Sequence, residues 1–212
     1  MNHKGIETIV KDRGLVDRRQ AQICAAALRL FSQKGFHQTS VREIAEATGL
    51  GTGTLYSYIQ RKEDILTLLY RRILAAFEAR MREATRGIED PRRQLQAALA
   101  ATLRIYDEYR DEVLLLYRES HAVGREGLEA LFEVDRTYVG VFRDILGRGI
   151  QRGEFRALDP DLHAVCILFL CAVWPLKRWN LKAYTLDTVT RALATLLMDG
   201  VGGRSAPAPA GE

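Results

Sequence analysis

Apolar side chains recur at helical spacing along almost the whole chain. The most complete series lies in residues 162–174, where apolar residues stand at every position of an i, i+3, i+4, i+7 pattern: Leu162, Val165, Cys166, Phe169, Leu170, Val173 and Trp174. No segment shows the strict apolar–polar alternation, bounded by turn residues, that predicts a half-buried strand. The pattern therefore predicts an all-α protein.

Start and stop signals divide this pattern into about nine helices. Two of them begin at an Asp-Pro pair, Asp90-Pro91 and Asp159-Pro160, in which the aspartate caps the helix and the proline occupies its first turn. Asp17 is expected to cap the first helix, and Lys34-Gly35 to end it. The helices are expected at residues 17–34, 40–48, 52–59, 61–86, 91–109, 111–122, 125–152, 160–176 and 185–200.

The second and third predicted helices are short and are joined by a glycine-containing turn. Ser40 and Glu43 have the sequence of a capping box, in which each side chain bonds the other residue's amide. The helix that they open is expected to stop at Thr48-Gly49, and the turn leads to Thr52, the expected cap of the next helix. Two short helices around a tight turn are typical of a helix-turn-helix, although helical bundles also contain such connections.

The net charge of the chain is +4 and is unevenly distributed. Residues 1–62 contain ten Lys or Arg and five Asp or Glu, a net +5, whereas residues 63–212 carry a net −1. A basic segment joined to a nearly neutral body indicates a polyanion partner for the first segment alone. A solvated surface also shows such asymmetry by chance, so charge by itself leaves both interpretations open.

The sequence lacks the patterns that define several other protein classes. The three cysteines form no C-x-x-C pair, so we expect neither a disulfide framework nor a zinc site, and a reducing cytoplasm is favoured. The longest apolar run, residues 164–176, is shorter than the roughly 17–25 residues of a membrane span. No histidine follows a glutamate by three residues, and neither a G-x-x-x-x-G-K loop nor a G-x-S-x-G elbow occurs. We therefore expect no enzymatic activity, no cofactor and no metal.

The residues around the predicted turn resemble a known family. The stretch TSVREIAEATGL at residues 39–50, followed by GTLYSYI at 53–59 and KEDIL at 62–66, closely resembles the DNA-binding signature of TetR-family regulators. Upstream, ALRLFSQKGF at residues 27–36 is similar to the family's first helix and its glycine corner. The sequence departs from the family's common residues at Thr52, Ile59 and Arg61, and of these only Thr52 bears on which operator sequence is read.

The resemblance implies a bacterial transcriptional repressor whose third helix lies in the DNA major groove. Gly49 is expected at positive φ, and Gly53 at the closest approach to the DNA because it has no side chain. The residues expected to contact bases or phosphates are Thr39, Ser40, Arg42, Thr52, Gly53, Thr54, Tyr56, Ser57, Tyr58 and Lys62.

Other residues of this segment are expected to pack in the core, and the basic residues before it have two possible roles. Leu55 and Ile59 are expected to pack on the first two helices, and one of Tyr56 and Tyr58 is expected to be partly buried. A basic arm can reach a minor groove or simply be solvated, and both interpretations apply to Lys4, Lys11, Arg13, Arg18 and Arg19.

The last two long helices are expected to form a homodimer, as the family resemblance implies. The predicted helix at 160–176 is apolar on all sides, which is more apolar surface than one monomer core covers. A two-fold dimer matches a roughly palindromic operator, whereas complete burial inside the monomer is the alternative. The expected interface residues are Val165, Phe169, Val173, Leu186, Val189, Leu193 and Leu196.

The helices between the two ends are expected to surround an effector pocket. Its candidate lining residues, which are also ordinary core residues by type, are Phe77, Tyr106, Tyr109, Tyr117, His121, Phe132, Tyr138, Phe142 and Trp174. So many aromatic residues favour an apolar or amphipathic effector. The stretch WPLKRWN at 174–180 is similar to regulators of fatty-acid or acyl-CoA metabolism. Two interpretations apply to Lys177, Arg178 and Lys182: they pair with the phosphates of a CoA group, or they form a solvated helix end.

These observations predict a flexible arm at residues 1–16, a helix-turn-helix domain at 17–62, a ligand-binding and dimerisation domain at 63–200 and a disordered tail at 201–212. The predicted function is that of a cytoplasmic TetR-type repressor, released from a palindromic operator by a small apolar or amphipathic effector. Two more specific alternatives stand beside it. One is a regulator that responds to fatty acids or acyl-CoA, and the other is an architectural DNA-binding protein without an effector.

Overall fold

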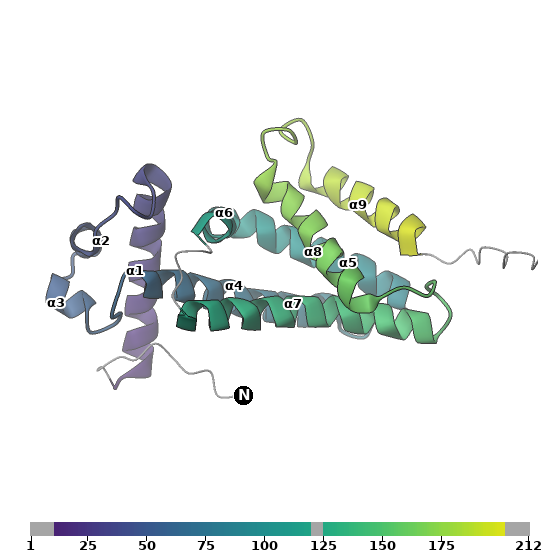
Figure 1. Cartoon of the computed structure of the whole chain (residues 1–212), viewed down its shortest axis with the longest axis horizontal. Helices are drawn as coiled ribbons and strands as arrows, with labels where there is room; N and C mark the ends of the chain where they lie inside the picture. Colours follow the sequence, from purple (N-terminus) through teal and green to yellow (C-terminus); the bar gives the residue numbers. More distant parts are fainter. Residues whose placement is uncertain (1–10, 120–124, 202–212) are drawn as a thin grey trace, which may run out of the picture. The chain divides into compact units, whose positions relative to one another are not determined.

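The computed structural model describes residues 11–119 and 125–201, and the side chains of 120–135 are not among those described. Within these residues the chain forms helices and no β-strand, which confirms the all-α prediction (Figure 1). The helices are α1 (Arg13–Lys34), α2 (Val41–Thr48), α3 (Thr52–Leu55), α4 (Glu63–Thr85), α5 (Pro91–Glu108), α6 (Arg110–Glu119), α7 (Arg125–Gln151), α8 (Pro160–Leu176) and α9 (Leu186–Val201).

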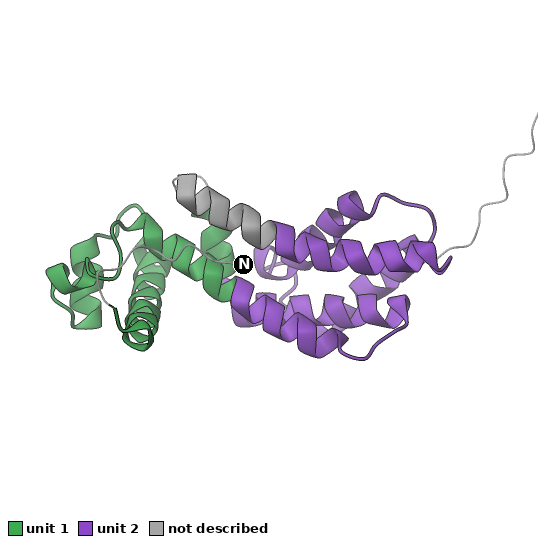
Figure 2. Cartoon of the chain, turned by 90° about the horizontal axis from the view of Figure 1, so that it is seen from below, with its two compact units in different colours: residues 1–73, 111–134 green, residues 74–110, 135–212 purple. Residues whose placement is uncertain are grey.

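The chain divides into two compact units (Figure 2). Unit 1 comprises residues 1–73 and 111–134, and unit 2 comprises residues 74–110 and 135–212. Unit 1 therefore contains α1–α3 together with the first part of α4, α6 and the start of α7. It extends beyond the end of the predicted helix-turn-helix segment at residue 62, and an ion pair between His37 and Glu119 joins α6 to the α1–α2 turn.

Helix α1 begins earlier than the sequence pattern indicates. Asp12 is its N-cap and accepts a hydrogen bond from the Leu15 amide at 3.0 Å, whereas Asp17 lies inside the helix. Val16, which lies in this additional turn, is buried. The prediction of an arm reaching to residue 16 is therefore wrong for residues 13–16, and residues 1–10 lie outside the described part.

Two predicted helix starts are confirmed, and both ends of the third helix are corrected. Asp90 and Asp159 each accept hydrogen bonds from amides of the first turn, ahead of a proline at the start of the helix. Helix α3 is shorter than predicted and ends at Leu55, with Tyr56 as its C-cap. Its N-cap is Gly51 rather than Thr52, and no side chain caps it.

The core of unit 1 consists of apolar side chains from α1–α4. Ile23, Ile44, Leu55 and Ile59 are completely buried, which confirms the packing role predicted for the last two. Phe31 packs edge-on against Phe36 with ring centroids 5.0 Å apart. Burial of such side chains contributes roughly 1.5–3 kcal/mol each, so this small unit has a real core under its short helices.

Unit 2 is built around α5, which packs against both α8 and α9. Leu95, Leu99 and Leu103 of α5 are buried, as is Trp174 of α8, whose indole Nε1 donates to Asp107 Oδ1 at 2.7 Å. Within the described residues, no helix combines the length and the apolarity that a membrane span requires. The long apolar run of α8 is instead explained by packing within unit 2 on one side and by an exposed face on the other.

Candidate nucleic-acid interface

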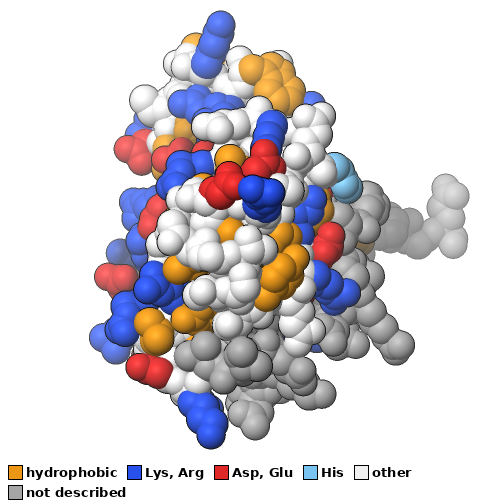
Figure 3. All heavy atoms as spheres, turned by 90° about the vertical axis from the view of Figure 1, so that its left-hand side faces the viewer, with side chains coloured by type: hydrophobic (Ala, Val, Ile, Leu, Met, Phe, Trp, Pro, Cys, Tyr) orange, Lys and Arg blue, Asp and Glu red, His pale blue; other side chains and the backbone are white. Residues whose placement is uncertain are grey.

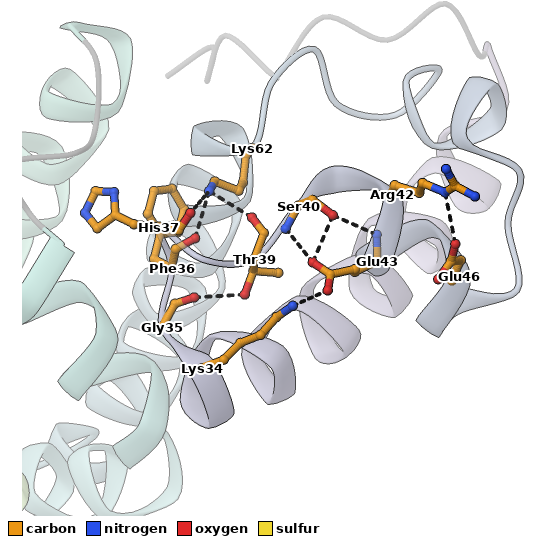
Figure 4. Close-up of polar contacts among 10 residues, drawn as sticks. All are labelled: Lys34, Gly35, Phe36, His37, Thr39, Ser40, Arg42, Glu43, Glu46 and Lys62. Atoms are coloured by element: carbon orange, nitrogen blue, oxygen red, sulfur yellow. Dashed lines mark hydrogen bonds and ion pairs between the residues drawn. The ribbon is translucent and has the colours of Figure 1, made fainter.

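The start of α2 is fixed by the capping box that the sequence predicts (Figure 4). Ser40 Oγ accepts from the Glu43 amide at 3.2 Å, and the Ser40 amide donates to Glu43 Oε2 at 2.8 Å. Lys34 at the end of α1 binds the same carboxylate. The Ser40 hydroxyl also donates to Glu43 Oε2, at 2.9 Å. The Lys34 contact and the hydrogen bonds that the carboxylate accepts from the Ser40 amide and hydroxyl lower the pKa of Glu43 to about 2, so the carboxylate stays ionised as the capping box requires.

The turn between α2 and α3 depends on a glycine in the left-handed region. Gly49 has φ 68° and ψ 15°, which confirms its predicted positive φ. The Leu50 amide donates back to Ala45 O at 3.0 Å and closes the helix end. From α1, Gln22 Nε2 donates to Thr48 O at 2.7 Å. The turn is therefore held both by its own backbone and by α1, and α3 has a defined direction.

The outer face of α3 and the turn after it expose a row of small polar residues and one aromatic ring. Thr52, Gly53 and Thr54 are exposed, and Tyr56 is 49% exposed. Ser57 is half-buried, and its hydroxyl lies 3.5 Å from Gly53 O. Hydroxyl groups and a ring edge on a short helix can meet base edges in a major groove.

Three of the predicted contact residues do not lie on this outer face. Thr39 is 1% exposed, and its hydroxyl donates to Gly35 O at 2.8 Å. Tyr58 is 5% exposed, which makes it the buried member of the tyrosine pair. Lys62 Nζ donates to Phe36 O at 2.7 Å and to Thr39 O at 2.9 Å (Figure 4). Each of these three side chains is used inside unit 1, and their predicted contact with DNA stays a prediction.

Cations are available around the outer face. Arg42 is 82% exposed along its side chain and lies 3.2 Å from Glu46 of the same helix. Figure 3 shows more Lys and Arg side chains than Asp and Glu side chains on the face turned toward the viewer. Lys11, Arg13 and Arg18, at the start of α1, are exposed. Such a surface suits a polyanion.

Sequence reasoning missed the polar side chains that connect these elements. Gln20 Nε2 donates to Tyr58 O at 3.1 Å, and Gln22 bonds the end of α2. His37 Nε2 lies 3.2 Å from Glu119 Oε2, which joins the α1–α2 turn to the end of α6. A glutamine or histidine on a helix or turn is ordinarily solvated, so no sequence signal distinguishes these residues.

Most of the predicted pocket residues lie in unit 2 and are buried there. Phe77 stacks on Tyr138 with ring centroids 3.5 Å apart and an interplanar angle of 22°. Burial raises the pKa of Tyr138 far above its usual value. Tyr106 and Phe142 are buried, as is Trp174, and Tyr109 is half-buried.

The other predicted pocket residues are not in this group. Tyr117 belongs to α6 in unit 1 and is 45% exposed, so it is not part of the buried aromatic cluster of unit 2. His121 and the side chain of Phe132 lie outside the described residues.

Helices α8 and α9 expose part of the predicted dimer face. Val165, Phe169 and Leu196 are each at least half exposed, and Val173 and Leu186 are half-buried. Leu162, at the start of the same stripe, is also exposed. Val189 and Leu193 are buried at 7% and 9% exposure, because they pack inside unit 2. These two residues therefore belong to the core of unit 2, and their predicted part in the dimer interface stays a prediction.

The helix-turn-helix geometry defines a class of DNA-binding regulator, and comparison with known proteins identifies the family. The family model for bacterial regulatory proteins of the tetR family matches residues 23–69. The model of the tetracycline repressor-like C-terminal domain matches residues 89–201. The chain belongs to the TetR family, and it is a TetR-type DNA-binding transcriptional regulator.

Individual relatives agree with this assignment. The chain is 29% identical to the HTH-type transcriptional regulator HbdR of Aromatoleum sp. (strain CIB), over 83% of this chain and 77% of that protein. It is 27% identical to the fatty acid metabolism regulator protein of Bacillus subtilis, over 85% and 94%. It is 26% identical to the HTH-type transcriptional repressor KstR2 of Rhodococcus jostii, over 86% and 91%.

Solved structures have the same fold. A tetR-family regulatory protein from Rhodococcus RHA1 superimposes with a TM-score of 0.78 at 23% identity, covering 86% of this chain and 96% of that chain. The regulator FadR from Bacillus subtilis, in complex with stearoyl-CoA, has a TM-score of 0.74 at 26% identity, covering 85% and 98%.

Proposed function

We propose that the chain is a homodimeric repressor that binds a palindromic operator and is released by an acyl-CoA. The observation that carries the DNA-binding part is the exposed face of α3 and the following turn, held by the capping box of α2 and the buried Leu55. Thr52, Thr54 and Tyr56 meet base edges, and Gly53 allows the backbone to approach. Ser40, Arg42 and Ser57 are placed for phosphates or sugars at the rim of the groove.

The dimer is proposed from the exposed apolar stripe of α8 and α9. Leu162, Val165, Phe169 and Leu196 are all at least half exposed, and water-exposed apolar patches on a helix pair mark an association surface. A two-fold axis through this surface relates two copies of α3, so that the pair matches two half-sites.

A thiol reagent tests this surface in the unmodified protein. Cys24 and Cys171 are buried, and burial raises the pKa of each thiol to about 12, whereas Cys166 is exposed beside Val165. Only Cys166 is therefore expected to react quickly with dithionitrobenzoate. Its reaction should slow as the protein concentration rises through the dimer dissociation constant, and a rate independent of concentration would contradict the proposed surface.

The effector class is proposed from the relatives and from the apolar interior of unit 2. FadR from Bacillus subtilis was crystallised with stearoyl-CoA, and its chain is 26% identical to this one. The regulator AibR, a structural neighbour, was crystallised with isovaleryl coenzyme A and operator DNA. The aromatic side chains of unit 2, Phe77 and Tyr138 among them, suit an acyl chain better than a polar ligand.

A fluorescence-anisotropy titration tests the proposed function. The full chain is titrated onto duplex DNA from upstream of its own gene, with stearoyl-CoA, isovaleryl-CoA, free CoA or free stearate present. We expect tight binding without additives and release by one acyl-CoA but not by free CoA. Binding that no additive reverses would instead favour the architectural protein, and a chain that does not bind DNA would contradict the whole proposal.

A further inference from the structure

The ammonium group of Lys62 is bound by backbone carbonyls of the α1–α2 turn. Nζ lies 2.7 Å from Phe36 O, 2.9 Å from Thr39 O and 3.5 Å from His37 O (Figure 4). It also lies 4.4 Å from the centroid of the Phe36 ring, in cation–π geometry. A lysine ammonium has three N–H donors and no acceptor. The carbonyls of Phe36 and Thr39 use two of them at short distance, and the carbonyl of His37 lies at the outer limit for the third.

The turn that Lys62 holds leads directly into the DNA-facing helices. Gly35 ends α1 with φ 90°, and Ser40, five residues later, is the N-cap of α2. Between them the Thr39 hydroxyl donates to Gly35 O, so the turn is bonded to the end of α1 as well. Lys62 therefore binds the backbone immediately before Ser40, the residue that caps α2.

Lys62 is itself held in place at the start of α4. Asp64, which is 8% exposed, accepts from the amides of Gln60 and Arg61 at 2.7 and 3.0 Å. These bonds fix the backbone immediately before α4, and Lys62 projects from it onto the turn. The lysine therefore connects two segments that are 23–26 residues apart in sequence.

We infer that Lys62 is a positioning residue for DNA binding, which orients α2 through the α1–α2 turn and does not touch a phosphate. The inference rests on the proposed DNA-binding function of the same site. It differs from the simplest reading of a lysine at a DNA-binding surface, which is a phosphate contact. A phosphate would have to displace at least one of the carbonyls and leave it without its donor.

The salt dependence of DNA binding distinguishes the two roles. Each phosphate neutralised by a cation contributes about −0.9 to the slope of log K against log salt concentration on duplex DNA. Removing a phosphate contact therefore makes the slope of a two-fold dimer less steep by about 1.8. Removing a cation that only orients the protein lowers the affinity and leaves the slope unchanged.

The experiment compares K62M, K62R and R42M with the wild-type chain on one duplex of about 30 base pairs, selected for binding to the wild type. We expect K62M to lose affinity by at least about tenfold, the equivalent of one charge-assisted hydrogen bond, with the wild-type salt slope. R42M is the matched control, because Arg42 is exposed. The salt slope of R42M should be less steep than that of the wild type. K62R should not restore the affinity in full, because the donors of a guanidinium lie in one plane and on a larger group than the compact ammonium on which these carbonyls converge.

Three results would overturn the inference. They are a salt slope of K62M that is as much less steep as that of R42M, an unchanged DNA affinity of K62M, or full recovery of the wild-type affinity in K62R. If K62M does not fold, K62R and hydrogen exchange of the turn amides decide the question. In K62R without DNA, the amide of Thr39 should exchange faster than in the wild type, and unchanged exchange would count against the inference. Failure of the wild type itself to bind any duplex would instead refute the proposed function.

Discussion

Replacing Phe169 with glutamate separates association of the chain from its folding. Phe169 lies on the exposed stripe of α8 and is 64% exposed in the monomer, so the change removes little packing within unit 2. In the proposed dimer the same side chain is buried against the second copy. F169E is therefore expected to fold normally and to remain monomeric at concentrations at which the wild type is a dimer.

The size of the effect follows from the exposed area. A phenylalanine side chain covers roughly 200 Å², of which the exposed share is about 130 Å². At about 25 cal/mol per Å², burying that area contributes at most ~3 kcal/mol per subunit and ~6 kcal/mol per symmetric dimer. Loss of only half of the dimer value, ~3 kcal/mol, already raises the dimer dissociation constant by roughly 100-fold. The buried unpaired carboxylates of the variant add to this loss.

Sedimentation velocity at several protein concentrations measures the result, and thermal unfolding shows that the variant is folded. W179E is the matched control, because Trp179 is an equally exposed aromatic residue, at 64%, that lies after the end of α8 and outside the stripe. W179E should remain dimeric. A folded F169E that sediments as a dimer would refute the proposed interface. Leu193 is unsuitable for this test, since it is 9% exposed and a glutamate there would disrupt unit 2 itself.

Three further substitutions test the DNA-facing surface and the packing. In G53R, a Cβ at Gly53 meets no atom within 4 Å. The variant should therefore fold and dimerise but lose at least about tenfold in operator affinity by anisotropy; wild-type affinity would contradict the placement of α3. Ser40→Ala removes the α2 cap and should lower the unfolding free energy by about 1 kcal/mol in urea titration, and no change would show that the capping box contributes nothing. Gly149→Ala places a Cβ 2.0 Å from the Phe155 ring and should destabilise the chain by ~1–3 kcal/mol. Gly147→Ala on the same helix is the control, because its Cβ meets nothing within 4 Å. Equal stability of the two variants would contradict the packing of α7.

The sequence predicted well those features whose interactions are local. The capping box of Ser40 and Glu43, the positive φ of Gly49 and the Asp-Pro starts of α5 and α8 all depend on hydrogen bonds within a few residues. The start of α1 was harder to predict, because Asp12 and Asp17 are equally good caps. The burial of Val16, a tertiary contact, decides between them.

Features that depend on distant contacts were not predictable. Nothing near Lys62 in sequence shows that its ammonium meets carbonyls 23–26 residues away. Similarly, Tyr56 and Tyr58 are two residues apart and of the same type, and only the packing of unit 1 shows that Tyr58 is the buried one. On α9, a single leucine stripe serves both the monomer core, at Leu193, and the exposed face, at Leu196, and periodicity alone does not divide it.

The most direct test of the central claim is selection of binding sites from a random duplex pool by the purified full-length chain. A dimer that places one α3 in each of two major grooves predicts enrichment of an inverted repeat, with half-site centres separated by about 10 base pairs or a multiple of that. Sequence preferences should be concentrated in the two half-sites. Recovery of no enriched sequence, or of a single half-site without its inverted partner, would contradict the account.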